Sequence, residues 1–240
     1  ITAIFIGLAF ITKSFLSSLL LLIGLILLAY YLMLEKRSKR PLLPINLLLD
    51  NRVLIYSLLA SLCNYMATFA IALLLSMHLQ LISNLSASET GFILMLGPLC
   101  QCLLSPLAGK LVGKISPHTL VLSGMALSTI ATLIYANLSL TTALIIINLA
   151  QILGGIGFGL FSSPNTTLVM SSVDKTKLAL VNGLQAFSRN LGMALCMAVI
   201  TLIIALFIKV SPQNPEYVIE LNETISSCFL ISPILGVLGM

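Results

Sequence analysis

The stretch LALVNGLQAFSRNLGMALCMAVITLIIALFI, residues 178–208, is apolar for almost its whole length and holds one charged side chain, Arg189. A helix that crosses the hydrocarbon core of a bilayer needs about 20 mostly apolar residues, and this stretch is long enough. The whole chain of 240 residues is similar, because 59% of it is hydrophobic and only 8% is charged. A soluble domain carries about 25% charged residues, so we predict an all-α integral membrane protein.

Seven further apolar stretches flank this one, separated by polar or charged residues. The chain begins with Ile1 inside an apolar stretch, so we expect a fragment of a longer polypeptide. Residues 1–34 would form a pair of extra spans, the first of them partial, and residues 35–51 a basic linker. Residues 52–240 would form a six-helix bundle whose last helix is cut short. We expect its helices at 52–80, 89–112, 119–136, 141–170, 178–208 and 224–240, with Pro164 as a candidate break.

The positive charges gather in alternate loops. Nine of the 12 Lys and Arg residues fall in one set of loops, whereas only Lys13 and Lys209 fall in the other. Basic loops stay on the cytoplasmic side of a membrane, so we predict that residues 35–51, 110–118 and 171–177 are cytoplasmic. Membrane topology thus accounts for the net charge of +5, and we expect no nucleic-acid partner.

Four of the expected helices carry small or polar residues at intervals of three or four, which places them on one helical face. We expect these faces to turn away from lipid. The pattern fits close helix packing with interhelical hydrogen bonds, and it fits equally a water-filled cavity that substrate can enter. The faces are Ser57, Ser61, Asn64 and Thr68; Gly97, Gln101, Ser105 and Gly109; Asn148, Gln151, Gly155 and Gly159; and Asn182, Gln185, Arg189, Gly192 and Cys196. The helix at 119–136 carries only small and hydroxyl residues and is expected to be a support helix.

Arg189 lies well inside its apolar stretch, roughly eleven residues or 16 Å from the cytoplasmic end at 1.5 Å per residue. A cation at such a depth costs at least about 2.5–3.5 kcal/mol, so it needs an anion, a group of carbonyls or water. No Asp or Glu lies inside the expected helices. A carboxylate partner would therefore come from a missing part of the chain or from substrate. The alternative is a structural arginine bonded to backbone carbonyls and to Asn190 or Gln185.

The sequence shows no pattern typical of an enzyme. His78 and His118 have no neighbours that suggest a metal site or a catalytic triad, and the five cysteines lie in apolar stretches. Gly154–Gly159 has the wrong spacing for a dinucleotide-binding loop and lies between apolar segments. We therefore expect no catalytic residue, no metal and no cofactor.

Several motifs resemble those of a known family. LSASETG at 85–91 resembles the capped start of the second helix in the C-terminal half of major facilitator transporters, and SPLAGKLVGK at 105–114 is similar to their short basic cytoplasmic loop. GIGFGLFSSP at 155–164 and VNGLQAFSRNLG at 181–192 resemble the third- and second-last helices of the fourteen-span drug:proton antiporters. LEKRSKRPLLP at 34–44 resembles the join between two extra helices and the C-terminal bundle of that family. The loop departs from the motif, since Gly113 stands where an acidic residue is usual.

This resemblance implies one half of a proton-coupled exporter of amphipathic drugs, located in the bacterial inner membrane and driven by the proton gradient. Its partners would be a small-molecule substrate, the lipid bilayer and the missing N-terminal half, which carries the family's proton-binding carboxylates. The helices at 52–80, 89–112, 141–170 and 178–208 would surround the cavity. The expected cavity residues are Asn64, Thr68, Gln101, Asn148, Gln151, Gln185 and Arg189; the expected packing or conformational residues are Gly109, Lys110, Gly113, Lys114, Gly155, Gly159, Pro164 and Gly192. The alternatives are a transporter of another small solute, such as a sugar, metabolite or siderophore, and a membrane sensor or scaffold.

Overall fold

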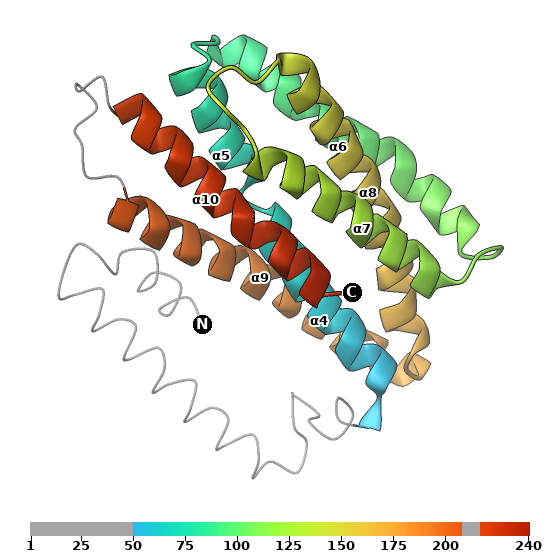
Figure 1. Ribbon diagram of the computed structural model, residues 1–240. Coiled ribbons are helices and arrows are strands. Elements are labelled where there is room, and N and C mark those ends of the chain that lie inside the picture. Colours follow the sequence, from blue (N-terminus) through green and yellow to red (C-terminus); the bar gives the residue numbers. More distant parts are fainter. Residues whose placement is uncertain (1–49, 208–216) are drawn as a thin grey trace.

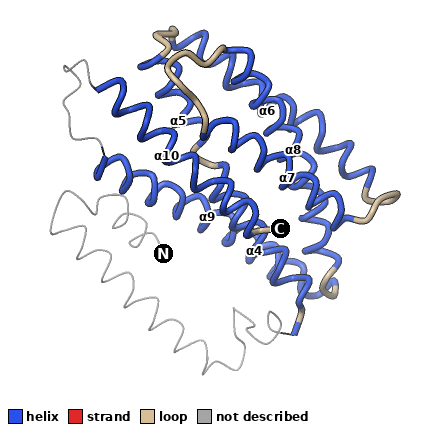
Figure 2. Tube along the Cα trace, viewed as in Figure 1, coloured by secondary structure: helices blue, strands red, loops and turns tan. Residues whose placement is uncertain are grey.

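The computed structural model describes residues 50–207 and 217–240, and this part of the chain is helical with no strands (Figures 1 and 2). The expected helices at 1–34 and most of the linker at 35–51 lie outside these residues. Six helical segments of the described chain are long and apolar enough to cross a membrane. They comprise α4 (Arg52–Thr68) with α5 (Ile71–Met77) and η1 (His78–Ile82), then α6 (Ala87–Leu111), α7 (Pro117–Ala136), α8 (Leu144–Ser171), η2 (Lys175–Lys177) with α9 (Leu178–Phe207), and α10 (Tyr217–Leu238).

Local sequence signals explain where several of these helices begin. Ser86 and Glu89 form a reciprocal capping box at the start of α6, with the Ser86 backbone N–H donating to Glu89 Oε2 over 2.9 Å. The side chain of Asn51 caps α4 by accepting from the backbone N–H of Leu54 over 3.0 Å. Pro117 begins α7, where its missing N–H costs no helical hydrogen bond. The capped start expected at residues 85–91 is thus confirmed.

Three boundaries differ from the sequence prediction. The first long segment turns at Phe69 and Ala70 and ends in one turn of π-helix, neither of which was expected. α8 runs without a break through Pro164, so the candidate break there was wrong. α10 begins at Tyr217 rather than at residue 224, so Glu220 and Glu223, expected in a loop, belong to its first two turns. Its 22 residues suffice by length to cross a bilayer.

The helices pack in the spatial order α6, α8, α7, α10, α4, α9, so that α7 and α10 lie at the middle of the bundle (Figure 1). The α7–α8 contact is close because glycines face each other across it. A Cβ atom added to Gly124 would lie 2.6 Å from the carbonyl oxygen of Gly157, and one added to Gly157 would lie 2.6 Å from the Ser128 nitrogen. Small residues at such a crossing let two backbones approach each other within a membrane.

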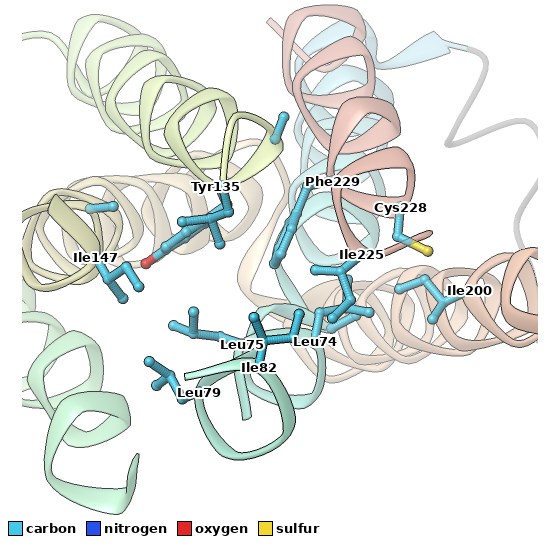
Figure 3. Close-up of a cluster of buried hydrophobic side chains, with 14 of the residues drawn as sticks. Leu74, Leu75, Leu79, Ile82, Tyr135, Ile147, Ile200, Ile225, Cys228 and Phe229 are labelled. Atoms are coloured by element: carbon cyan, nitrogen blue, oxygen red, sulfur yellow. The ribbon is translucent and has the colours of Figure 1, made fainter. Parts of the chain in front are cut away.

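The largest apolar core joins α5, α7, α8 and α10 near one end of the bundle (Figure 3). Tyr135 of α7 and Phe229 of α10 are fully buried in it, with their ring centroids 5.2 Å apart. Leu74, Leu75 and Leu79 pack beneath these rings. This core holds the α5 end of the first segment against α7 and α10, and it thereby helps to position the cavity described next.

Candidate substrate cavity

A cavity of about 370 Å³ lies between α4, α6 and α8, with smaller contributions from α5, α7 and α9. Its volume falls within the range of small-molecule sites, roughly 300–1,000 Å³. Three of the predicted cavity residues, Thr68, Gln101 and Gln151, lie together in its wall. The remaining lining residues are mostly apolar: Tyr65, Phe69, Ile71, Ala72, Leu94, Gly97, Pro98, Ser128, Tyr135, Gly154, Gly155, Phe158 and Met193.

Aromatic rings form one side of the cavity. Tyr65 of α4 and Phe158 of α8 meet edge to face, with ring centroids 5.3 Å apart and an interplanar angle of 89°. Phe158 also contacts Phe161, which is almost fully buried behind it, at a centroid distance of 6.3 Å. These contacts hold the rings in place and make them a rigid apolar surface for a ligand.

The polar side chains of the cavity are held differently from one another. Thr68 donates from its hydroxyl to the backbone oxygen of Asn64 over 2.8 Å, which is a bond within its own helix. Gln101 and Gln151 form no hydrogen bond with any described residue, although Gln151 is largely buried. Two amide groups therefore remain available to a ligand or to water.

Arg189 lies beside the cavity and is exposed in this part of the protein. Its guanidinium carbon is 5.8 Å from the centroid of the Tyr65 ring, so the cation faces an aromatic wall residue. Within the described chain no carboxylate lies in ion-pairing distance of it. Arg189 forms no hydrogen bond with a described residue, so the structural alternative of a bond to Gln185 or Asn190 is not seen; Gln185 donates to the Thr166 hydroxyl over 2.9 Å.

A comparison with known protein families gives a clear match. The model of the Major Facilitator Superfamily matches residues 2–197, which is most of the chain. The chain belongs to the major facilitator superfamily.

Three bacterial transporters illustrate the relationship. The riboflavin transporter RibZ of Clostridioides difficile is 28% identical over 174 residues, which are 69% of this chain and 38% of RibZ. The uncharacterized transporter YebQ of Escherichia coli is 31% identical over 171 residues, 70% of this chain and 36% of YebQ. Multidrug resistance protein Stp of Mycobacterium tuberculosis is 27% identical over 184 residues, 75% of this chain and 33% of Stp. The chain thus spans little more than a third of these relatives, and as a major facilitator it is an integral, multi-pass membrane protein.

Part of the polar face of α4 packs inside this major facilitator bundle and does not reach the cavity. Asn165 of α8 donates from its amide to the Ser57 carbonyl over 3.2 Å and to the Ser61 hydroxyl over 2.7 Å. Asn64, on the same face, is buried, and its Oδ1 has no hydrogen-bond partner in the described chain; the same holds for Asn148 Oδ1 on α8. Neither side chain lines the cavity.

The predicted packing residues fall into two groups in the structure. Gly155, Gly159 and Gly192 lie at close helix crossings; a Cβ atom on Gly192, for example, would lie 2.5 Å from the Leu62 carbonyl oxygen. Gly109 faces the hydroxyl of Ser163, and Pro164 is buried within α8. Lys110 in the last turn of α6, and Gly113 and Lys114 after it, are all exposed, and a Cβ atom on Gly113 would make only an ordinary contact with the Lys110 carbonyl oxygen at 3.8 Å.

The residues that give the cavity its shape were not predicted from the sequence. Tyr65 and Phe158 form its aromatic side, Gly97 leaves space in the α6 wall, and Ser128 and Tyr135 extend the lining to α7. α7 was expected only to support the bundle, yet it contributes to the cavity. One signal was present for Gly97, because it stands one helical turn before Gln101 on the same face of α6.

The basic residues of the described chain, apart from Arg189, lie at one end of the bundle. Arg52 begins α4, Lys110 lies in the last turn of α6 and Lys114 lies between α6 and α7. Lys175 and Lys177 form the short helix before α9. Asn51 connects the start of α4 to the end of α8, because its amide donates to the Ser172 carbonyl oxygen. The structure therefore separates a basic end from an end that carries Glu89, Glu220 and Glu223.

Proposed function

We propose that this chain is one half of a secondary active transporter that exports amphipathic small molecules in exchange for protons by alternating access. The observation that carries this proposal is the cavity between α4, α6 and α8, whose wall is mainly aromatic and aliphatic with a few uncharged polar groups. Such a wall suits amphipathic compounds, which need apolar contact and few hydrogen bonds. Substrate binding near the middle of the membrane, between two halves that rock against each other, is the general mode of such transporters.

The uneven burial of the helices supports a missing partner half. Few residues of α6 and α9 are buried in this bundle, whereas more than half of α7 is. α6 and α9 also carry Gln101 and Arg189, which would be costly to place against lipid. We infer that these faces meet the N-terminal half of the full polypeptide, which would close the cavity from the other side.

We assign the basic end of the bundle to the cytoplasmic side of a bacterial inner membrane. Arg52, Lys110, Lys114, Lys175 and Lys177 all lie at that end. Cytoplasmic loops carry an excess of Lys and Arg, which supports this orientation. The relatives RibZ, YebQ and Stp come from bacteria, which supports the type of membrane.

Arg189 would couple the cavity to charge in the missing half. Stacked beside Tyr65, its guanidinium can bind an anionic group of a substrate, or it can pair with a carboxylate of the N-terminal half and release that carboxylate when it is protonated. Protonation and substrate binding would then compete, as exchange of a drug for a proton requires.

The test is Arg189→Gln in the complete transporter, measured as proton-driven export of ethidium from proteoliposomes. We expect a loss of about tenfold or more in the export rate, because a charge-assisted contact to an ionised group contributes about 1.5–3 kcal/mol. Arg52→Gln, which removes an exposed charge at the basic end, is the matched control and should export at the wild-type rate. Wild-type export by Arg189→Gln would show that Arg189 does not pair with a carboxylate whose protonation drives export.

A second candidate is export or uptake of a neutral aromatic metabolite. The specific observation in its favour is that no charged residue is among those that line the cavity, while two unpaired amides are. The relationship to the riboflavin transporter RibZ points the same way. Competition of flavins against ethidium in the same proteoliposomes separates the two candidates.

A further inference from the structure

The cavity offers a ligand aromatic surface and hydrogen bonds but no fixed charge. The described residues that line it include Tyr65, Phe69 and Phe158 but no Asp, Glu, Lys or Arg. An ionised group buried in this wall would lose its water without gaining a counter-charge, which is unfavourable. The wall therefore favours the uncharged part of a ligand, and its aromatic side favours a flat ring system.

Two amide groups face this space from two adjacent helices. Gln101 projects from α6 and Gln151 from α8, and neither forms a hydrogen bond to a described residue. An amide side chain presents one donor and one acceptor side by side. It can therefore pair with any planar edge that carries the complementary acceptor and donor, as glutamine does with the edge of adenine.

Gly97 determines where the amide of Gln151 lies. A Cβ atom added to Gly97 would stand 3.1 Å from Gln151 Oε1 and 3.8 Å from Gln151 Cδ. The absence of a side chain at this position thus makes room for the amide against α6. Gln101 follows Gly97 by one helical turn, so its Cα atom lies roughly 6 Å from that of Gly97 along the α6 axis at 1.5 Å per residue.

We propose that Gln101 and Gln151, with Gly97, form a recognition subsite for neutral planar ligands that carry a lactam or imide edge, in which a ring N–H stands next to a ring carbonyl. This inference rests on the proposed transport function and names one class of compound among its amphipathic substrates. The ring system packs against Tyr65 and Phe158, and its polar edge bonds to the two amides. A ligand without such an edge leaves both amides unpaired in a buried site and binds more weakly.

The test uses the complete transporter, purified in detergent, and three probes. Lumichrome is a neutral fluorescent alloxazine with an imide edge, its 1,3-dimethyl derivative has no ring N–H beside a ring carbonyl, and tetraphenylphosphonium is an apolar cation without hydrogen-bonding groups. We expect the wild-type protein to bind lumichrome at least about tenfold more tightly than the methylated compound, since an unpaired buried amide is costly. In Gln151→Met this preference should fall to near one, because the amide that pairs with the imide edge is absent, and binding of tetraphenylphosphonium by the variant shows that it is folded.

Gly97→Ala gives an independent test that leaves both amides in the sequence. It should weaken the preference for lumichrome, because the added methyl group would stand 3.1 Å from Gln151 Oε1 and push the amide out of its position by a few tenths of an ångström. The matched control is Gly91→Ala on the same helix, where a Cβ atom meets nothing within 4 Å and the preference should remain. Equal wild-type binding of lumichrome and its dimethyl derivative, or an unchanged preference in Gln151→Met, would overturn the subsite while leaving the transport proposal intact. A wild-type protein that moves none of the probes across a membrane would remove the transport function, and the subsite would fall with it.

Discussion

Asn165 connects two helices of the bundle through both hydrogens of its amide. It is 1% exposed and donates to the Ser57 carbonyl over 3.2 Å and to the Ser61 hydroxyl over 2.7 Å. Interhelical hydrogen bonds in membrane proteins each contribute about 0.6 kcal/mol on average and up to about 2 kcal/mol. Asn165 therefore stabilises the contact between α4 and α8 at the position where an apolar side chain would leave Ser61 unpaired.

We predict that Asn165→Leu lowers the stability of the protein by about 1–2 kcal/mol, because the Ser61 hydroxyl loses its partner inside the bundle. The measurement is thermal unfolding in detergent, followed by the reactivity of buried cysteines. Asn190→Leu, which changes an exposed amide on α9, is the control and should unfold at the wild-type temperature. An unchanged unfolding temperature in Asn165→Leu would contradict the stabilising role.

At the level of residues, the sequence identified charged and amide groups better than aromatic ones. Arg189, Gln101 and Gln151 stand out in apolar helices because a polar group in lipid is costly. Tyr65 and Phe158 could not be assigned to the cavity, since an aromatic ring is equally suited to face lipid, a core or a ligand. Only the packing of α4 against α8 shows that these two rings meet.

At the level of elements, the glycines of α8 differ in how closely a neighbouring helix approaches them. Gly157 lies against the backbone of α7, whereas a Cβ atom on Gly154 would lie 3.4 Å from the Ala131 Cβ, an ordinary contact. We predict that Gly157→Ala forces α7 and α8 apart and destabilises the protein by about 1–3 kcal/mol, as overpacking does. Gly154→Ala should be nearly neutral in the same unfolding assay. Equal stability of the two variants would show that the crossing is less close than described.

The helices themselves could largely be predicted, because a span is a long apolar stretch and its ends are polar. The start of α10 was not predicted because Glu220 and Glu223 are polar for a membrane span. Both residues nevertheless lie in the first two turns of α10. The π-helical turn at His78–Ile82 has no glycine or proline to mark it, since it depends on packing against the rest of the bundle. A break was predicted at Pro164 where none exists, because a membrane helix can continue through a proline when neighbouring helices satisfy the freed backbone groups.

At the level of the whole molecule, the orientation in the membrane can be tested with single cysteines. Gly113 lies in the exposed turn at the basic end, and Ser139 lies in the exposed connection between α7 and α8 at the other end. We predict that, in a variant free of native cysteines, Ser139→Cys reacts with an impermeant maleimide in intact spheroplasts. Gly113→Cys should react only after the membrane is opened. The reverse pattern would invert the orientation.

The central claim is that the cavity between α4, α6 and α8 forms part of a transport pathway that opens alternately to the two sides. The most direct measurement is the labelling of Thr68→Cys by an impermeant maleimide in the complete, otherwise cysteine-free transporter, with and without ethidium. Thr68 lines the cavity, while Leu103, on the exposed face of α6, provides the control Leu103→Cys. We predict that Thr68→Cys is labelled from both sides of the membrane and is protected by ethidium, whereas ethidium leaves the labelling of Leu103→Cys unchanged. Labelling of Thr68→Cys from one side only, or without protection by ethidium, would contradict this claim.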